Sequence, residues 1–207
     1  MTCKKGGFIC MRHDEVRDLT VKMLKEVCVD VTSEPTLLQL DGEQMRHFTA
    51  NTSAEARVDI RARGFWTRGQ QAFSDIRIFD PMAACHNQLT LDAAHRKNET
   101  DKIRAYGERI QQVDQGSFTP LVFTTSGGMG PLAKRFYTRL AELLAEKKRQ
   151  PKSCIVAWMR CLLSFYLLRS ALLCLRGTRS SPIRTINISD IDFEDIVSES
   201  LIDFRLN

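Results

Sequence analysis

The sequence predicts an α/β fold with a small core. Helical and strand-like stretches alternate over residues 12–149 in the order helix, strands, acidic hairpin, helix, strand and helix. A length of 207 residues is enough for a domain with a well-buried core. The predicted organisation is a domain over residues 1–150, a helical extension over 151–186 and an acidic tail over 187–207. The short acidic and apolar alternation of the tail is compatible with disorder.

Charge is unevenly distributed along the chain. The tail contains six acidic residues against Arg205 alone, so a net charge of +5 divides into +10 for residues 1–186 and −5 for the tail. A basic body with an acidic tail suggests a nucleic-acid surface and a self-masking extension.

The cysteines and the N-terminus indicate a nuclear or cytoplasmic protein rather than a secreted one. Seven cysteines are present, but no apolar stretch of signal-peptide length begins the chain, so free thiols are expected. Cys3, Cys10 and His13 are spaced unlike any standard zinc motif and have no evident fourth ligand. A zinc site is therefore not expected there.

The first predicted helix covers residues 12–28. Glu15 lies on the flank of its apolar stripe, where a carboxylate can reach a metal site beside the sheet, although most such glutamates only solvate a helix. The stripe repeats at helical spacing and consists of Val16, Leu19, Thr20, Met23, Leu24 and Val27.

Two strands, over residues 57–63 and 72–79, form the acidic hairpin, with turns at Gly64 and Gly69. Each strand contains one aspartate, Asp59 or Asp75, a residue type that strands disfavour. If both carboxylates face one side, they form a site for a hard cation such as Mg²⁺. The alternative is an exposed hairpin whose aspartates balance the neighbouring arginines. These arginines are Arg57, Arg61, Arg63, Arg68 and Arg77.

A polar helix is predicted over residues 92–115, and Lys102 and Tyr106 share one of its faces. Its buried stripe is expected to contain Ile103, Tyr106, Ile110 and Val113. A strand over 118–125 then leads into the glycine cluster of residues 127–130. This cluster lacks the Lys-Ser/Thr of a P-loop and is interpreted as a turn.

Two helices complete the predicted elements. The first begins at Pro131 and ends near residue 149, with a basic end that complements the helix dipole. The second, over 153–175, is apolar but contains Arg160 and Arg169, which are costly at a bilayer centre. It is therefore expected to pack against the protein rather than to cross a membrane.

Several segments, in this order, resemble a known family. They are Arg12-His13-Asp14, Glu34-Pro35, Arg57-Val58-Asp59, Asp75-Ile76-Arg77-Ile78, the Lys102 to Tyr106 spacing, and the strand from Pro120 into the turn at Gly128. The succession is similar to the restriction-like endonuclease domain that follows the reverse transcriptase in site-specific non-LTR (LINE-type) retrotransposons. It is also similar to reverse-transcriptase-associated open reading frames of animal genomes.

The resemblance implies the PD-(D/E)xK nuclease fold, with a small mixed sheet flanked by helices, over roughly residues 8–150. It assigns Asp59 and Asp75, with the carbonyl of Ile76, to Mg²⁺ or Mn²⁺, and Glu15 as a further ligand. Lys102 orients the attacking water, and Tyr106 supports Lys102. Arg77 stands where many members have lysine, and arginine stays protonated and cannot act as a base.

The implied function is metal-dependent cleavage or nicking of DNA, with Arg57, Arg61, Arg63 and Arg77 holding phosphates. RNA remains open as a partner, while neither a membrane nor a small-molecule substrate is expected. Two alternatives stay open. One is an inactive DNA-binding relic of such an element, and the other is an interaction protein built on the C-terminal helices.

Overall fold

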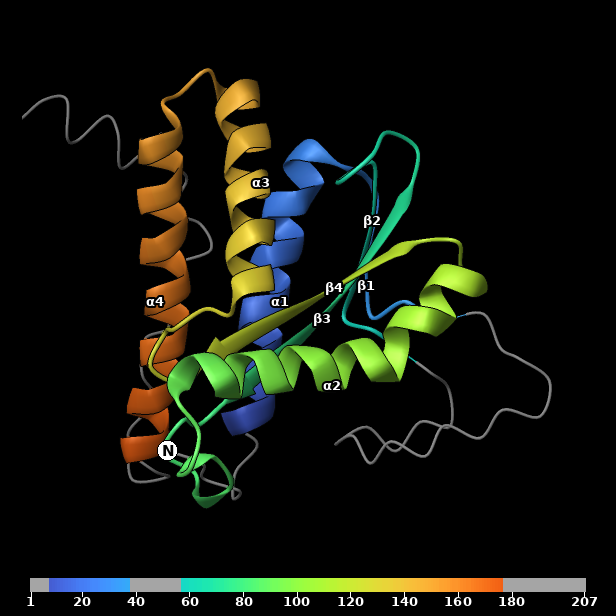
Figure 1. Ribbon diagram of the computed structural model, residues 1–207. Helices are drawn as coiled ribbons and strands as arrows, with labels where there is room; N and C mark the ends of the chain where they lie inside the picture. The colour runs from blue at the N-terminus through green and yellow to red at the C-terminus, as the bar shows by residue number, and fades with distance from the viewer. Residues whose placement is uncertain (1–7, 38–56, 177–207) are drawn as a thin grey trace, which may run out of the picture.

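The computed structural model describes residues 8–37 and 57–176. The predicted acidic tail and Cys3 lie outside these residues. The elements, shown in Figure 1, are α1 (Phe8–Val27), β1 (Val29–Ser33), β2 (Ile60–Arg63), β3 (Gln71–Phe79), η1 (Ala84–His86), α2 (Leu91–Gln112), β4 (Ser117–Thr124), α3 (Pro131–Lys148) and α4 (Lys152–Arg176).

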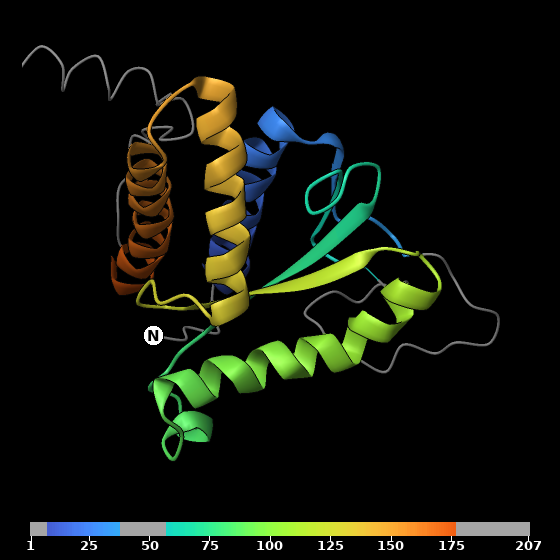
Figure 2. The ribbon, with the colours of Figure 1, turned by 45° about the horizontal axis from the view of Figure 1, so that its top comes forward.

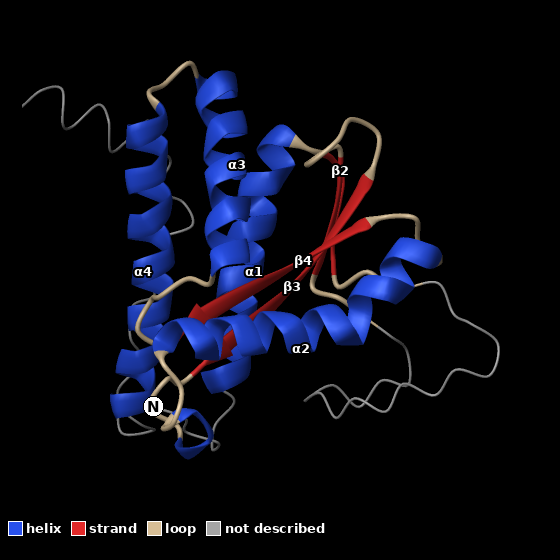
Figure 3. Ribbon diagram, viewed as in Figure 1, coloured by secondary structure: helices blue, strands red, loops and turns tan. Residues whose placement is uncertain are grey.

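The four strands form one mixed sheet in the order β1-β2-β3-β4. β1, β2 and β3 are successive antiparallel neighbours, and β4 pairs in parallel with β3. A parallel neighbour requires a crossover connection, and α2 provides it (Figure 3). The predicted α/β class and small mixed sheet are thereby confirmed.

Helices cover both faces of the sheet. α1, α3 and α4 gather on one side, and α2 runs along the other (Figure 2). The main core joins α1, α3 and α4 to one sheet face and includes Val16, Ile76, Leu140 and Ile155. A smaller cluster on the opposite face joins α2 to the sheet through Tyr106, Ile110 and Phe73. The alternation of strand side chains produces these two faces.

α4 is not a peripheral addition to this core. Its residues Ile155, Met159 and Leu163 are at most 2% exposed and belong to the same cluster as α1 and α3. The boundary at residue 151 stays a prediction, but the two predicted parts share one core. Within the described residues, no helix is long and apolar enough to cross a membrane.

Two details of the predicted elements differ from the structure. Ile103 was expected in the buried stripe of α2, but it is 42% exposed. The stripe also includes buried polar side chains, His95, Asn98 and Glu99, which a count of apolar residues overlooks. The hairpin strand predicted from residue 57 begins as β2 at Ile60, because regular pairing with β3 begins there.

Candidate active site

Asp59 and Asp75 come together at the point where β2 begins beside β3. The last pairing between these strands joins Ile60 to Ser74. Beyond this pair, the backbone amide of Ile76 donates a hydrogen bond to Oδ2 of Asp59 instead of to a backbone carbonyl of β2. The Asp59 carboxylate therefore lies beside the strand residue that follows Asp75.

Lys102 reaches Asp75 from α2 and forms an ion pair with its Oδ2. Both side chains are largely buried, with 19% of Lys102 and 8% of Asp75 exposed. The ring of Tyr106, one turn further along α2, lies 5.6 Å from the Lys102 ammonium nitrogen. Burial opposes the charge of Lys102, but Asp75 outweighs it, so the pKa of Lys102 is raised and the side chain stays protonated.

The pKa of Asp75 is raised to about 6, first by burial and then by the negative charge of Asp59. The positive charges of Lys102 and His13 oppose this rise only in part. A carboxyl that titrates near neutral pH beside a second carboxylate is typical of a functional site, although structural ion-pair networks produce the same effect.

His13 also belongs to this site, although it was not among the site residues predicted from the sequence. Its Nε2 lies 3.1 Å from Oδ2 of Asp59, and its Nδ1 lies 3.3 Å from Oδ1 of Asp14. Burial disfavours the imidazolium, but the hydrogen bond and charge of Asp59 raise the pKa of His13 to about 9. Its place in the Arg12-His13-Asp14 segment was the only signal in the sequence that pointed to this role.

Glu15 is held elsewhere. Its Oε1 lies 3.7 Å from a guanidinium nitrogen of Arg169 on α4, and its Oε2 is buried with no hydrogen-bond partner among the described residues. Burial raises the pKa of Glu15, and Arg169 partly opposes the rise. Glu15 thus joins α1 to α4, and the structure does not bring it to Asp59 and Asp75.

The predicted phosphate-binding arginines divide into two groups. Arg77 lies two positions after Asp75 on β3, so both side chains are on the same face of the sheet. Arg61 pairs across the sheet with Phe73 and therefore lies on this face too. Arg63 lies on this face too, where it bonds to Asp30 and to the carbonyl of Gly69. Arg57 lies outside the strand, in an isolated bridge with Thr36.

No cluster of three or more His, Cys, Asp or Glu side chains suited to a metal ion occurs among residues 8–37 and 57–176. Cys10 is exposed, and His13 is engaged with Asp59. Mg²⁺ often binds proteins through only one or two carboxylates and keeps several waters. The pair Asp59 and Asp75 is compatible with that requirement, because a cation between them would relieve the repulsion that raises the pKa of Asp75.

The cluster also has a purely structural interpretation. At neutral pH, His13 and Lys102 supply two positive charges against the two carboxylates, so the group balances without a metal ion. Asp59 additionally accepts a hydrogen bond from the backbone amide of Ile76 in β3. Comparison of the chain with protein-family models and with curated proteins finds no match to either.

Proposed function

We propose that the chain is a metal-dependent DNA endonuclease that nicks or cleaves phosphodiester bonds. The observation that supports this most directly is the convergence of Asp59, Asp75 and Lys102. Asp59 directly precedes β2, Asp75 lies in β3 and Lys102 in α2, and all three meet at the same stretch of β3. Two carboxylates can hold a divalent cation, and a protonated lysine can stabilise charge that develops on a phosphate.

In this proposal each side chain has a separate task. Asp59 and Asp75 would hold Mg²⁺ or Mn²⁺, which supplies charge neutralisation at the scissile phosphate and a more acidic bound water. Lys102 stays protonated and stabilises the charge that develops on the phosphate. His13 fixes the Asp59 carboxylate, and Tyr106 restricts the position of Lys102.

The basic residues on the same sheet face support a nucleic-acid substrate. Arg61, Arg63 and Arg77 lie on the face that carries Asp75. Contacts of this kind with phosphates give affinity without sequence preference.

The test is nicking of supercoiled plasmid by the full chain in Mg²⁺ or Mn²⁺. Asp59→Asn, Asp75→Asn and Lys102→Met should each abolish nicking while the far-ultraviolet circular dichroism stays native. Asp101→Asn and Lys97→Met are matched controls on α2 and should nick like the wild type. Nicking that survives Asp75→Asn would exclude this site as the source of the activity.

The charge balance of the cluster favours a second candidate, a DNA-binding relic without activity. In that case no variant cuts, and Asp75→Asn tightens DNA binding because it removes a negative charge from a basic face. Nicking by the wild type, together with DNA binding by Asp75→Asn, therefore separates the two candidates.

A further inference from the structure

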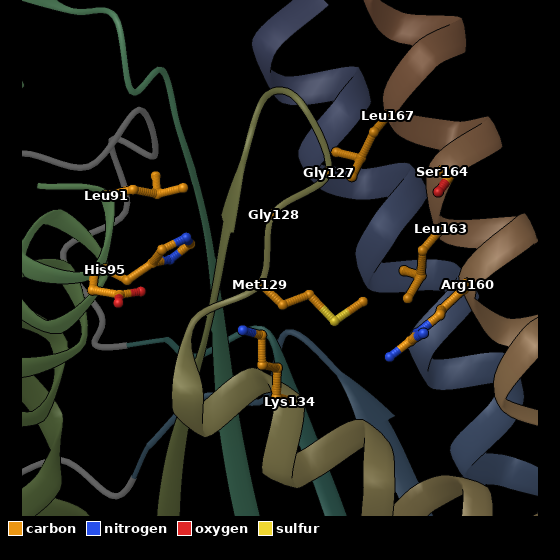
Figure 4. Close-up of a pocket in the computed structure, with 11 residues that line it drawn as sticks. Leu91, His95, Gly127, Gly128, Met129, Lys134, Arg160, Leu163, Ser164 and Leu167 are labelled. Carbon is orange, nitrogen blue, oxygen red and sulfur yellow. The ribbon is translucent and has the colours of Figure 1, made fainter.

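A concave site lies away from the acidic cluster, near the end of β4. It is a cavity of about 360 Å³ between the start of α2, the glycine turn, α3 and α4 (Figure 4). A neighbouring cavity of about 230 Å³ shares Met129, Lys134, Arg160 and Leu163 with it. The volume of the larger cavity is within the range of small-molecule sites, and such sites combine an apolar lining with a few polar groups.

The cavity has two cationic side chains. Lys134 extends from α3 and Arg160 from α4 toward the region beside Met129 (Figure 4). Neither side chain has an ion-pair partner within the described part of the chain. Asp92 also lines the cavity, but it occupies the first turn of α2, where a carboxylate complements the helix dipole. The cavity therefore retains an excess of positive charge.

His95 is a further polar group of the cavity wall. The side chain lines the cavity and is only 3% exposed, yet its Nδ1 has no hydrogen-bond partner in the described structure. Its ring meets Phe79 edge to face at 5.1 Å, which alone would suit an ordinary core histidine. The other ring nitrogen, Nε2, lies beside Gly128 of the cavity wall and is the nitrogen that a ligand there would meet.

The remaining walls suit an apolar group. Met129, Leu163 and Leu167 contribute aliphatic and thioether surface. At Gly128 a Cβ atom would lie 2.9 Å from Oγ1 of Thr124, so the turn packs this closely against Thr124 only because it lacks a side chain there. Gly127 and Gly128 thus contribute only backbone to the cavity wall.

We propose that this cavity binds a small organic anion. Lys134 and Arg160 hold its phosphate or carboxylate group, His95 offers a hydrogen bond, and the apolar side chains of the walls contact its body. This site is independent of the proposed nuclease site. The sequence did not lead us to expect a small-molecule ligand of any kind.

The experiment is an NMR titration of the full chain with four probes, followed at the Met129 methyl and the His95 imidazole. Phenyl phosphate and benzoate carry both an anion and an apolar ring, inorganic phosphate carries the anion alone, and phenol the ring alone. We expect phenyl phosphate or benzoate to bind at least roughly tenfold more tightly than the two partial probes, and the tighter of the two identifies the anion. Equal affinity for all four, or no shift at millimolar concentration, would overturn the proposal.

Charge variants complete the test. Lys134→Gln and Arg160→Gln should each weaken binding by roughly tenfold, because each removes a charge-assisted hydrogen bond. Lys97→Gln removes an exposed positive charge away from the cavity and should leave binding unchanged; an equal loss there would show general attraction and contradict the proposal. Lys102→Met should also bind normally, which separates this result from the outcome of the nuclease test.

Discussion

The imidazole Nε2 of His13 lies 3.1 Å from the Asp59 carboxylate, although the two residues are 46 positions apart in the chain. This contact ties α1 to the start of β2 and raises the pKa of His13. Titration of the His13 imidazole therefore reports on its contact with the candidate active site.

The first prediction concerns the pKa of His13. Asp59→Asn removes the charge and the strong hydrogen bond that raise this pKa to about 9, while burial, which lowers it, remains. The pKa of His13 should therefore fall clearly below 9. Titration of the imidazole carbon-bound protons by NMR measures it. Asp14→Asn is the control and should cause a smaller fall, because Asp14 contributes less. An unchanged value in Asp59→Asn would contradict the assigned contact.

Stability of the metal-free protein should decrease from neutral to alkaline pH. The pKa of His13 is higher in the folded than in the unfolded state, so the folded protein binds the proton more tightly. The resulting stabilisation is complete below about pH 6.5 and is lost as the pH rises through about 9. Its size is on the order of 3 kcal/mol. Urea unfolding at several pH values tests this, and His13→Gln should have a flatter profile in this window.

Glu15 and Arg169 should be coupled in stability and not in activity. Arg169→Met leaves a largely buried carboxylate without its cation and should cost roughly 1–3 kcal/mol of unfolding free energy. Glu15→Gln in the same chain should recover part of that loss, which a double-mutant cycle measures. If Glu15→Gln alone stopped plasmid nicking, Glu15 would belong to the active site after all.

Gly130 and Gly107 should respond oppositely to alanine. A Cβ at Gly130 would lie 2.5 Å from Oε1 of Glu99, which accepts a hydrogen bond from the amide of Leu132 at the start of α3. Gly130→Ala should therefore destabilise the protein by roughly 1.5–3 kcal/mol. Gly107 lies within α2, where its Cβ would meet only the side chain of the exposed Ile103, so alanine should stabilise by up to about 1 kcal/mol. Thermal unfolding of both variants decides the matter, and stabilisation by Gly130→Ala would refute the capping role of Glu99.

If the nuclease proposal holds, Arg61 and Arg63 should contribute to DNA affinity in a salt-dependent way. The double substitution to Gln should weaken binding to duplexes of any sequence. It should also reduce the slope of log affinity against log salt by about 0.9 for each phosphate that the variant no longer neutralises. Fluorescence anisotropy between low and moderate salt measures the slope, with Lys97→Gln as the charge control. A weaker affinity for one sequence alone would indicate base recognition instead.

The sequence anticipated those parts of the molecule that local patterns determine. The apolar stripe of α1 was correct because helical spacing alone defines it, and Val16, Met23 and Leu24 are all buried. The exposure of Ile103 was missed because α2 packs through the polar side chains of His95 and Glu99 as well as through apolar ones. Local patterns therefore fail where buried polar groups determine which face of a helix turns inward.

The candidate site was anticipated only in part for a similar reason. Asp59, Asp75 and Lys102 were chosen from the hairpin and the following helix, and the structure brings them together. The choice between Glu15 and His13 could not be made from the sequence. They are two positions apart on α1 and point in different directions, and only tertiary packing shows which one faces β2. In the structure His13 contacts Asp59 beside β2, and Glu15 contacts Arg169 on α4.

The parallel register of β4 against β3 also bears on how the molecule folds. β2 and β3 can pair early, since a short loop joins them, but β4 joins the sheet only after the 22-residue α2 has crossed over. Lys102 lies on that crossover helix, and His13 comes from α1 near the N-terminus. Closing such long loops has an entropic cost that only a nearly complete core repays. We therefore expect the acidic cluster to form late in folding, so that partly folded chains carry its two carboxylates without the two cations that balance them.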